Sequence, residues 1–170
     1  MRRMTEETAR VEITIRFATE ADLPLILSLI KELAEYERLA DEVVADVETL
    51  GRSLFGERAY AEVVIASLAD QPAGFALFFH NFSTFLGKPG LYLEDLYVRP
   101  EHRGKKIGER LLRTLARLAV ERNCGRLEWW VLDWNESAIA FYQRLDAEAM
   151  DDWTVYRVSG AALVTLANQS

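Results

Sequence analysis

The stretch LYLEDLYVRPEHRGKKIGERLLR, residues 91–113, decides how the chain is organised. Its apolar first part predicts a strand over residues 91–98, and the amphipathic pattern from Ile107 predicts a helix to about Arg122. A helix start leaves backbone N–H groups without partners and carries partial positive charge. The junction is therefore a candidate anion site formed by Arg103, Gly104, Lys105, Lys106, Ile107 and Gly108, the alternative being a basic loop with a routine helix start.

Periodicity along the rest of the chain predicts one mixed α/β (α+β) sheet flanked by helices. Strands are expected at residues 11–17, 60–68, 73–81, 91–98, 126–132 and 153–158, and further helices at 19–37, 46–54 and 135–144. The turn at residues 70–72 predicts an antiparallel hairpin, residues 82–90 a loop, and the later strand–helix–strand order a parallel strand pair. We expect a single domain over residues 11–170, a loose tail over residues 1–10 and a short apolar C-terminal tail.

The composition is that of a globular protein, with 50% hydrophobic and 28% charged residues in 170. Acidic residues outnumber basic ones, 27 to 20, which argues against nucleic-acid binding and suits either solubility or a cationic substrate. No apolar run is long enough for a membrane, and the polar run after Arg3 predicts a cytoplasmic protein. The single Cys124 excludes an internal disulfide, and His80 and His102 belong to no ligand cluster, so no metal is expected.

Two adjacent carboxylates, Glu94 and Asp95, lie in the central strand, where neighbouring side chains point to opposite faces unless a bulge intervenes. Glu94 lies between apolar residues, so partial burial is expected to raise its pKa and suit it as a general base, directly or through water. Asp95 is then a substrate anchor. The alternative is that both form structural ion pairs.

Further acids, Glu32, Glu35 and Glu37, gather with Tyr36 near the end of the helix at residues 19–37. Acids at this end oppose the helix dipole, which indicates either a functional use or a solvated face.

A third group consists of Asn135, Ala138 and Tyr142, which lie one and two turns apart on one helix face. A tyrosine, with a pKa of about 10 against about 8.5 for a thiol, can protonate a leaving thiolate. The alternative is that Phe141 and Tyr142 are both core aromatics.

The basic loop and its strand resemble motif A of the GCN5-related N-acetyltransferases, Arg/Gln-x-x-Gly-x-Gly/Ala. Arg103 and Gly108 match, whereas Lys106 stands at the middle glycine, where a side chain is acceptable if the dihedrals are helical. The resemblance implies that the loop N–H groups hold the coenzyme A pyrophosphate and that Leu96, Tyr97 and Val98 hold the pantetheine arm.

Residues 135–142, NESAIAFY, resemble motif B of the same family. The resemblance implies that Tyr142 is the general acid and that Asn135 and Ala138 lie along coenzyme A. Asp146 replaces a family glycine and tolerates the left-handed conformation expected there.

From Ile15 to about Val158 the chain is similar to the diamine acetyltransferases, on the stretches 29–37, 91–95 and 131–135. This resemblance implies a homodimer and an amine site of acids, including Asp95, with an aromatic that matches Trp153. Tyr36, Glu37, Ser83 and Phe85 complete the expected substrate residues. The missing acid at residues 83–85 argues against a long polyamine, and residues 131–135 favour the thialysine type.

We therefore predict an N-acetyltransferase that moves the acetyl group of acetyl-CoA to a primary amine of a small cationic diamine, polyamine or lysine-like amino acid, without nucleic acid, membrane or metal. One alternative is a coenzyme A-binding sensor with little catalysis, and another is acetylation of a protein N-terminus.

Overall fold

The computed structural model describes residues 12–169, so the predicted tail and Val11 lie outside the described residues. Its strands and α-helices are β1 (Ile13–Phe17), α1 (Leu23–Tyr36), α2 (Val47–Phe55), β2 (Glu62–Leu68), β3 (Gln71–Ser83), β4 (Lys88–Val98), α3 (Ile107–Glu121), β5 (Leu127–Trp129), α4 (Glu136–Gln143) and α5 (Gly160–Ala167). They divide into two compact units at Trp130 and Val131. The single domain over residues 11–170 stays a prediction.

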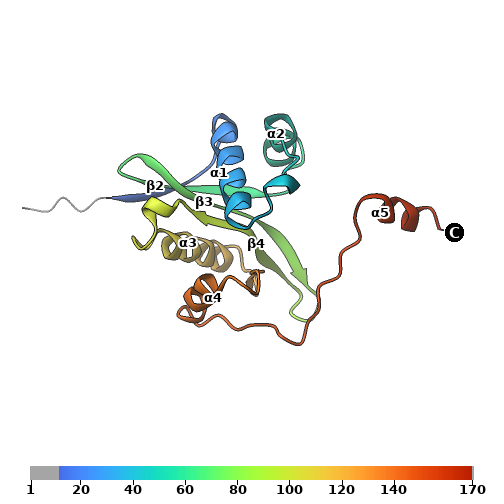
Figure 1. Cartoon of the computed structure of the whole chain (residues 1–170). Coiled ribbons are helices and arrows are strands. Elements are labelled where there is room, and N and C mark those ends of the chain that lie inside the picture. Colours follow the sequence, from blue (N-terminus) through green and yellow to red (C-terminus); the bar gives the residue numbers. More distant parts are fainter. Residues whose placement is uncertain (1–11, 170) are drawn as a thin grey trace, which may run out of the picture. The chain divides into compact units, whose positions relative to one another are not determined.

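The first unit contains one five-stranded sheet in the order β1-β2-β3-β4-β5. Neighbouring strands are antiparallel except β4 and β5, which are parallel. Helices α1 and α2 cover one face and α3 the other (Figure 1). The predicted mixed, largely antiparallel sheet with one parallel pair is confirmed.

The apolar stripes predicted for the two long helices form the core. On the α1 face, the cluster contains Leu23, Ile26, Leu29, Leu33, Leu54, Val63, Ile65, Phe75 and Tyr97. The stripe of α3 is also buried, at Ile107, Leu111, Leu112, Leu115 and Ala119. Each large apolar side chain that is fully buried contributes about 1.5–3 kcal/mol, so the two stripes hold the helices that flank the loop before α3.

The predicted loop over residues 82–90 is too long, because β3 and β4 pair out to Ser83 and Lys88 and the turn is confined to residues 84–87. Gly90 explains the difference. Asn81 passes over it to donate from Nδ2 to Glu128 Oε2 on β5 at 2.7 Å, and a Cβ on Gly90 would lie 2.2 Å from Asn81 Oδ1. Residues that are typical of turns are thus held in a ladder by cross-strand partners.

The predicted strand over residues 153–158 is also wrong, and the tail that follows it contains helix α5. A β-prone run forms a strand only where a neighbouring strand shares its hydrogen bonds, and the described part of the second unit contains no other strand. Strand β5 is likewise shorter than the predicted residues 126–132.

Candidate active site

The loop before α3 contains two residues in the left-handed conformation. Gly104 has a φ of 75°, and Lys106 has a φ of 65° and a ψ of 17°. Lys106 therefore does not adopt the right-handed helical dihedrals that a side chain prefers but the conformation that glycine favours, at a cost of about 1–2 kcal/mol. The backbone keeps the path of a glycine-containing loop although the side chain is a lysine.

The first turn of α3 offers backbone donors to a ligand. The carbonyl of Lys106 accepts its first helical bond from the N–H of Arg110 at 3.0 Å. The N–H groups of Ile107, Gly108 and Glu109 precede that bond, and within residues 12–169 no side chain caps them. These donors and the helix dipole fit the predicted anion site.

Two of the three predicted loop cations bind protein backbone. Arg103 donates from Nε to the carbonyl of Val98 at 3.0 Å, and Lys105 donates from Nζ to the carbonyl of Glu101 at 3.1 Å. The anion site therefore rests mainly on backbone N–H groups in this structure.

A bulge in β4 decides where the two carboxylates point. Phe78 of β3 pairs with Leu93, whereas the adjacent Leu77 pairs with Asp95, so Glu94 is an extra residue. Leu93 and Asp95 therefore point to opposite faces, and Asp95 joins the α1 face. The burial predicted for Glu94 is wrong, since Glu94 is exposed and its neighbour Asp95 is the partly buried carboxylate.

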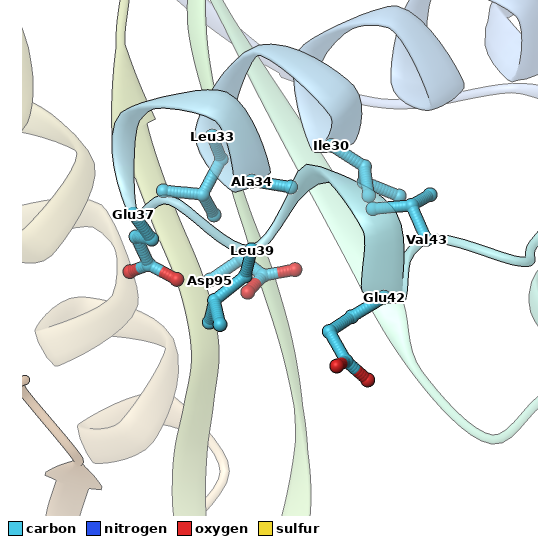
Figure 2. A pocket seen from close by; sticks show the side chains of 8 residues that line it. All are labelled: Ile30, Leu33, Ala34, Glu37, Leu39, Glu42, Val43 and Asp95. Atoms are coloured by element: carbon cyan, nitrogen blue, oxygen red, sulfur yellow. The ribbon is translucent and has the colours of Figure 1, made fainter.

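Asp95 lines a cavity of about 150 Å³ under the end of α1 (Figure 2). The other lining residues are Ile30, Leu33, Ala34, Glu37, Leu39, Glu42 and Val43. Burial, with smaller contributions from the charges of Glu94 and Glu37, raises the pKa of Asp95 from 3.8 to about 6. Burial also raises the pKa of Glu37. An ammonium group in this cavity would compensate buried negative charge, which makes it a candidate amine site.

Sequence patterns missed the part of this cavity that Leu39, Glu42 and Val43 supply. They lie before, in and after a short 3-10 turn, Ala40–Glu42, that carries no helix or strand periodicity. The predicted acid cluster also divides, because Glu37 lines the cavity whereas Glu32 forms an ion pair with Arg99 at 2.8 Å.

Beyond Leu93, the β5 side of β4 has no ladder partner in the described residues, because β5 pairs only with residues 91–93. The backbone groups of Leu96 and Val98, predicted to hold pantetheine, lie in this segment. The Tyr97 side chain is only 5% exposed and belongs to the α1 core. A role for Tyr97 in coenzyme binding is thereby limited to its backbone.

Ser83 and Phe85 lie at the turn of the β3–β4 hairpin. The Ser83 Oγ accepts from the N–H of Leu86 at 3.3 Å, and Phe85 is 96% exposed. Ser83 is six residues along β3 from Leu77, the partner of Asp95, which corresponds to about 20 Å. Within one chain, Ser83 and Phe85 therefore do not reach the Asp95 cavity.

The second unit carries the predicted general acid. Asn135 caps α4, and its Oδ1 accepts from the N–H of Ala138 at 3.3 Å, so that Tyr142 follows at helical spacing on the same face, as predicted. Asp146 has a φ of 60°, which confirms its left-handed conformation. Trp153 is 72% exposed. The role of Tyr142 as general acid stays a prediction.

Neither a membrane span nor a metal cluster is found in the described part of the chain. None of the helices in residues 12–169 is long and apolar enough to cross a membrane, and these residues contain no group of three or more His, Cys, Asp or Glu that could hold a metal ion.

The bulged strand, the loop of backbone donors and the acidic cavity fit an enzyme that transfers a group from an anionic carrier to an amine. Residues 27–147 match the model of the Acetyltransferase (GNAT) family. The chain belongs to that family, and it is an acyl-CoA-dependent N-acetyltransferase.

Similar proteins extend over most of the chain. A thialysine N-epsilon-acetyltransferase of Bos taurus is 36% identical and covers 92% of this chain and 98% of its own length. An L-ornithine N5-acetyltransferase of Arabidopsis thaliana is 32% identical, covering 88% of this chain and 85% of its own. Among solved structures, an integron cassette protein from the mobile metagenome of V. cholerae has a TM-score of 0.79 at 28% identity, covering 92% and 98% of the two chains.

Proposed function

We propose that this enzyme transfers the acetyl group of acetyl-CoA to a primary amine of a small cationic acceptor, of the thialysine, ornithine or diamine class. The observation that carries the proposal is the Asp95 cavity, in which a partly buried carboxylate lies among apolar walls and two further acids, Glu37 and Glu42. Such a cavity suits an alkyl chain that carries an ammonium group. The names of the similar proteins support the same class of acceptor.

In the proposed reaction the free amine attacks the thioester carbonyl, a C–N bond forms, and the C–S bond then breaks. Asp95 binds a cationic group of the acceptor and thereby positions the reacting amine. Before this attack, Glu94, exposed at the bulge, takes one proton from the acceptor's ammonium group through water and leaves the free amine. Tyr142 gives its phenolic proton to the departing thiolate, and the proton that the nitrogen loses as the amide forms restores the phenol. No metal takes part in this proposal.

The proposed coenzyme site uses the loop and β4. The N–H groups of residues 107–109 and the left-handed Gly104 and Lys106 form a concave set of donors for the pyrophosphate. The backbone of Leu96 and Val98 holds the pantetheine arm, and Asn135 and Ala138 lie along it.

An acceptor panel tests the proposal. The purified chain is mixed with acetyl-CoA and thialysine, L-ornithine, spermidine or a peptide with a free N-terminus, and thiol release and product mass are measured. We expect turnover with the small amines and little with the peptide. Turnover with the peptide alone would instead support acetylation of a protein N-terminus, and tight acetyl-CoA binding without thiol release would support a sensor.

With this function we propose a homodimer, on the resemblance to the diamine acetyltransferases, and a cytoplasmic location. Sedimentation velocity of the purified chain tests the first, and microscopy of a fluorescently tagged chain tests the second.

A further inference from the structure

The segment between β4 and the loop is fastened to the second half of α1 at two points. Arg99 donates from Nε and Nη2 to the Glu32 carboxylate at 3.0 and 2.8 Å. The Arg103 guanidinium carbon lies 4.5 Å from the centre of the Tyr36 ring. Glu32 and Tyr36 are one helical turn apart, so both arginines contact the same face of α1.

The Arg99–Glu32 pair is the more buried and more extensively hydrogen-bonded of the two contacts. The two side chains are only 24% and 28% exposed, and Arg99 also donates from Nη1 to the carbonyl of Pro72 at 3.0 Å. A bidentate, charge-assisted pair of this kind fixes both distance and orientation. The Arg103 contact is a cation–π contact with a more exposed cation.

Each end of the segment continues into one of the two sites. Arg103 is followed directly by Gly104, which opens the loop of backbone donors. Tyr36 is followed directly by Glu37, which lines the Asp95 cavity with Leu33 from the same helix. The contacts therefore form a short physical path from the coenzyme loop to the amine cavity.

We propose that these pairs, Arg99 with Glu32 and Arg103 with Tyr36, form an arginine clamp that couples coenzyme binding to amine binding. Arg103 is then a positioning residue and not a side-chain ligand of the pyrophosphate. The inference rests on the proposed function, because that function supplies the two ligands.

In this proposal, coenzyme binding restricts the motion of the loop, and the arginine clamp passes that restriction to the end of α1. A coenzyme that fixes residues 104–108 also fixes Arg103, which holds Tyr36 and the end of α1 in place. Glu37 is then already ordered when the amine binds, so amine binding loses less conformational entropy. By linkage, the amine tightens coenzyme binding by the same factor.

Calorimetric titration of the full chain with coenzyme A, without and with saturating thialysine, measures this factor as the ratio of the two Kd values. We expect thialysine to tighten coenzyme binding by about two- to fivefold, the range that one cation–π contact supplies. Arg103→Ala, Tyr36→Leu and Glu32→Gln should each bring the ratio towards one. Tyr36→Phe keeps the ring and should keep the ratio.

The double variant Arg103→Ala/Tyr36→Leu should lose no more coupling than either single variant. Arg52→Ala is the matched control, because Arg52 is an exposed arginine that pairs with Glu48 on α2, and it should leave the ratio unchanged. Melting curves of all variants show whether each remains folded.

Two results would overturn the proposal. One is a wild-type ratio of one. The other is a large loss of coenzyme affinity in Arg103→Ala, whether or not thialysine is present, with an unchanged ratio in Tyr36→Leu, which would make Arg103 a phosphate ligand. Failure of the proposed function appears separately, as absent turnover across the acceptor panel, because the binding ratio needs no turnover.

Discussion

Asp95→Asn tests whether the charged Asp95 carboxylate lowers the free energy of unfolding of the enzyme. Burial and the neighbouring charges of Glu94 and Glu37 raise the pKa of Asp95 from 3.8 to about 6. At 1.36 kcal/mol for each pH unit, that difference corresponds to about 3 kcal/mol of unfolding free energy. An uncharged side chain of the same shape avoids this cost.

The direction of the pH effect follows from proton linkage. Because the pKa of Asp95 is higher in the folded state, the folded protein binds this proton more tightly than the unfolded chain does. Its contribution to stability is therefore greatest below pH 3.8 and is lost as the pH rises through about 6. Asp95→Asn should lack this loss.

Urea unfolding of wild type and Asp95→Asn at pH 5, 6, 7 and 8 measures the effect. We expect the variant to gain stability relative to wild type as the pH rises, by up to about 2–3 kcal/mol at pH 8. Comparison at each pH cancels the titration of all other groups. Asp41→Asn is the control, because Asp41 is an exposed aspartate near the same cavity, and it should show no such trend.

The same variant should lose amine binding. Deprotonation of Asp95 strengthens its attraction for an ammonium group, so the wild-type Kd for thialysine should fall as the pH rises through about 6. In Asp95→Asn this dependence should disappear. A variant that is less stable than wild type at pH 8, or that keeps the pH dependence of binding, would refute the assignment of Asp95 as a buried amine anchor.

Three further variants test the loop, the acid and the hairpin. Lys106→Gly should raise the unfolding free energy by about 0.5–1 kcal/mol, because glycine suits the left-handed backbone. In urea unfolding, Lys105→Gly should instead lower it, and equal effects of the two changes would contradict the strain at Lys106. Tyr142→Phe should reduce kcat by about 10²–10⁴-fold with coenzyme affinity nearly intact by calorimetry, and unchanged turnover would show that another group is the acid. Gly90→Ala should lower stability by about 1–3 kcal/mol, because its Cβ meets Asn81 Oδ1, and an unchanged melting temperature would contradict that close approach.

The periodic helices and the anion loop could be predicted because their signals are local. Apolar residues three and four apart in α1 and α3 face a core in almost any arrangement, and a glycine-containing basic loop that enters a helix presents backbone donors. The prediction of a strand at residues 153–158 is wrong because strand formation is not decided by local signals. A strand depends on a partner that may be distant in sequence, and β propensity does not identify one.

The sequence by itself determined the mixed sheet, the loop of donors and the presence of two carboxylates beside it. Tertiary structure alone decided which carboxylate is buried, because the bulge at Glu94 turns Asp95 to the α1 face and no alternation of side chains reveals a bulge in advance. It also decided that Glu42, from a segment without periodicity, joins the Asp95 cavity. Burial and charge proximity are set by how distant segments pack, and they control the pKa of Asp95.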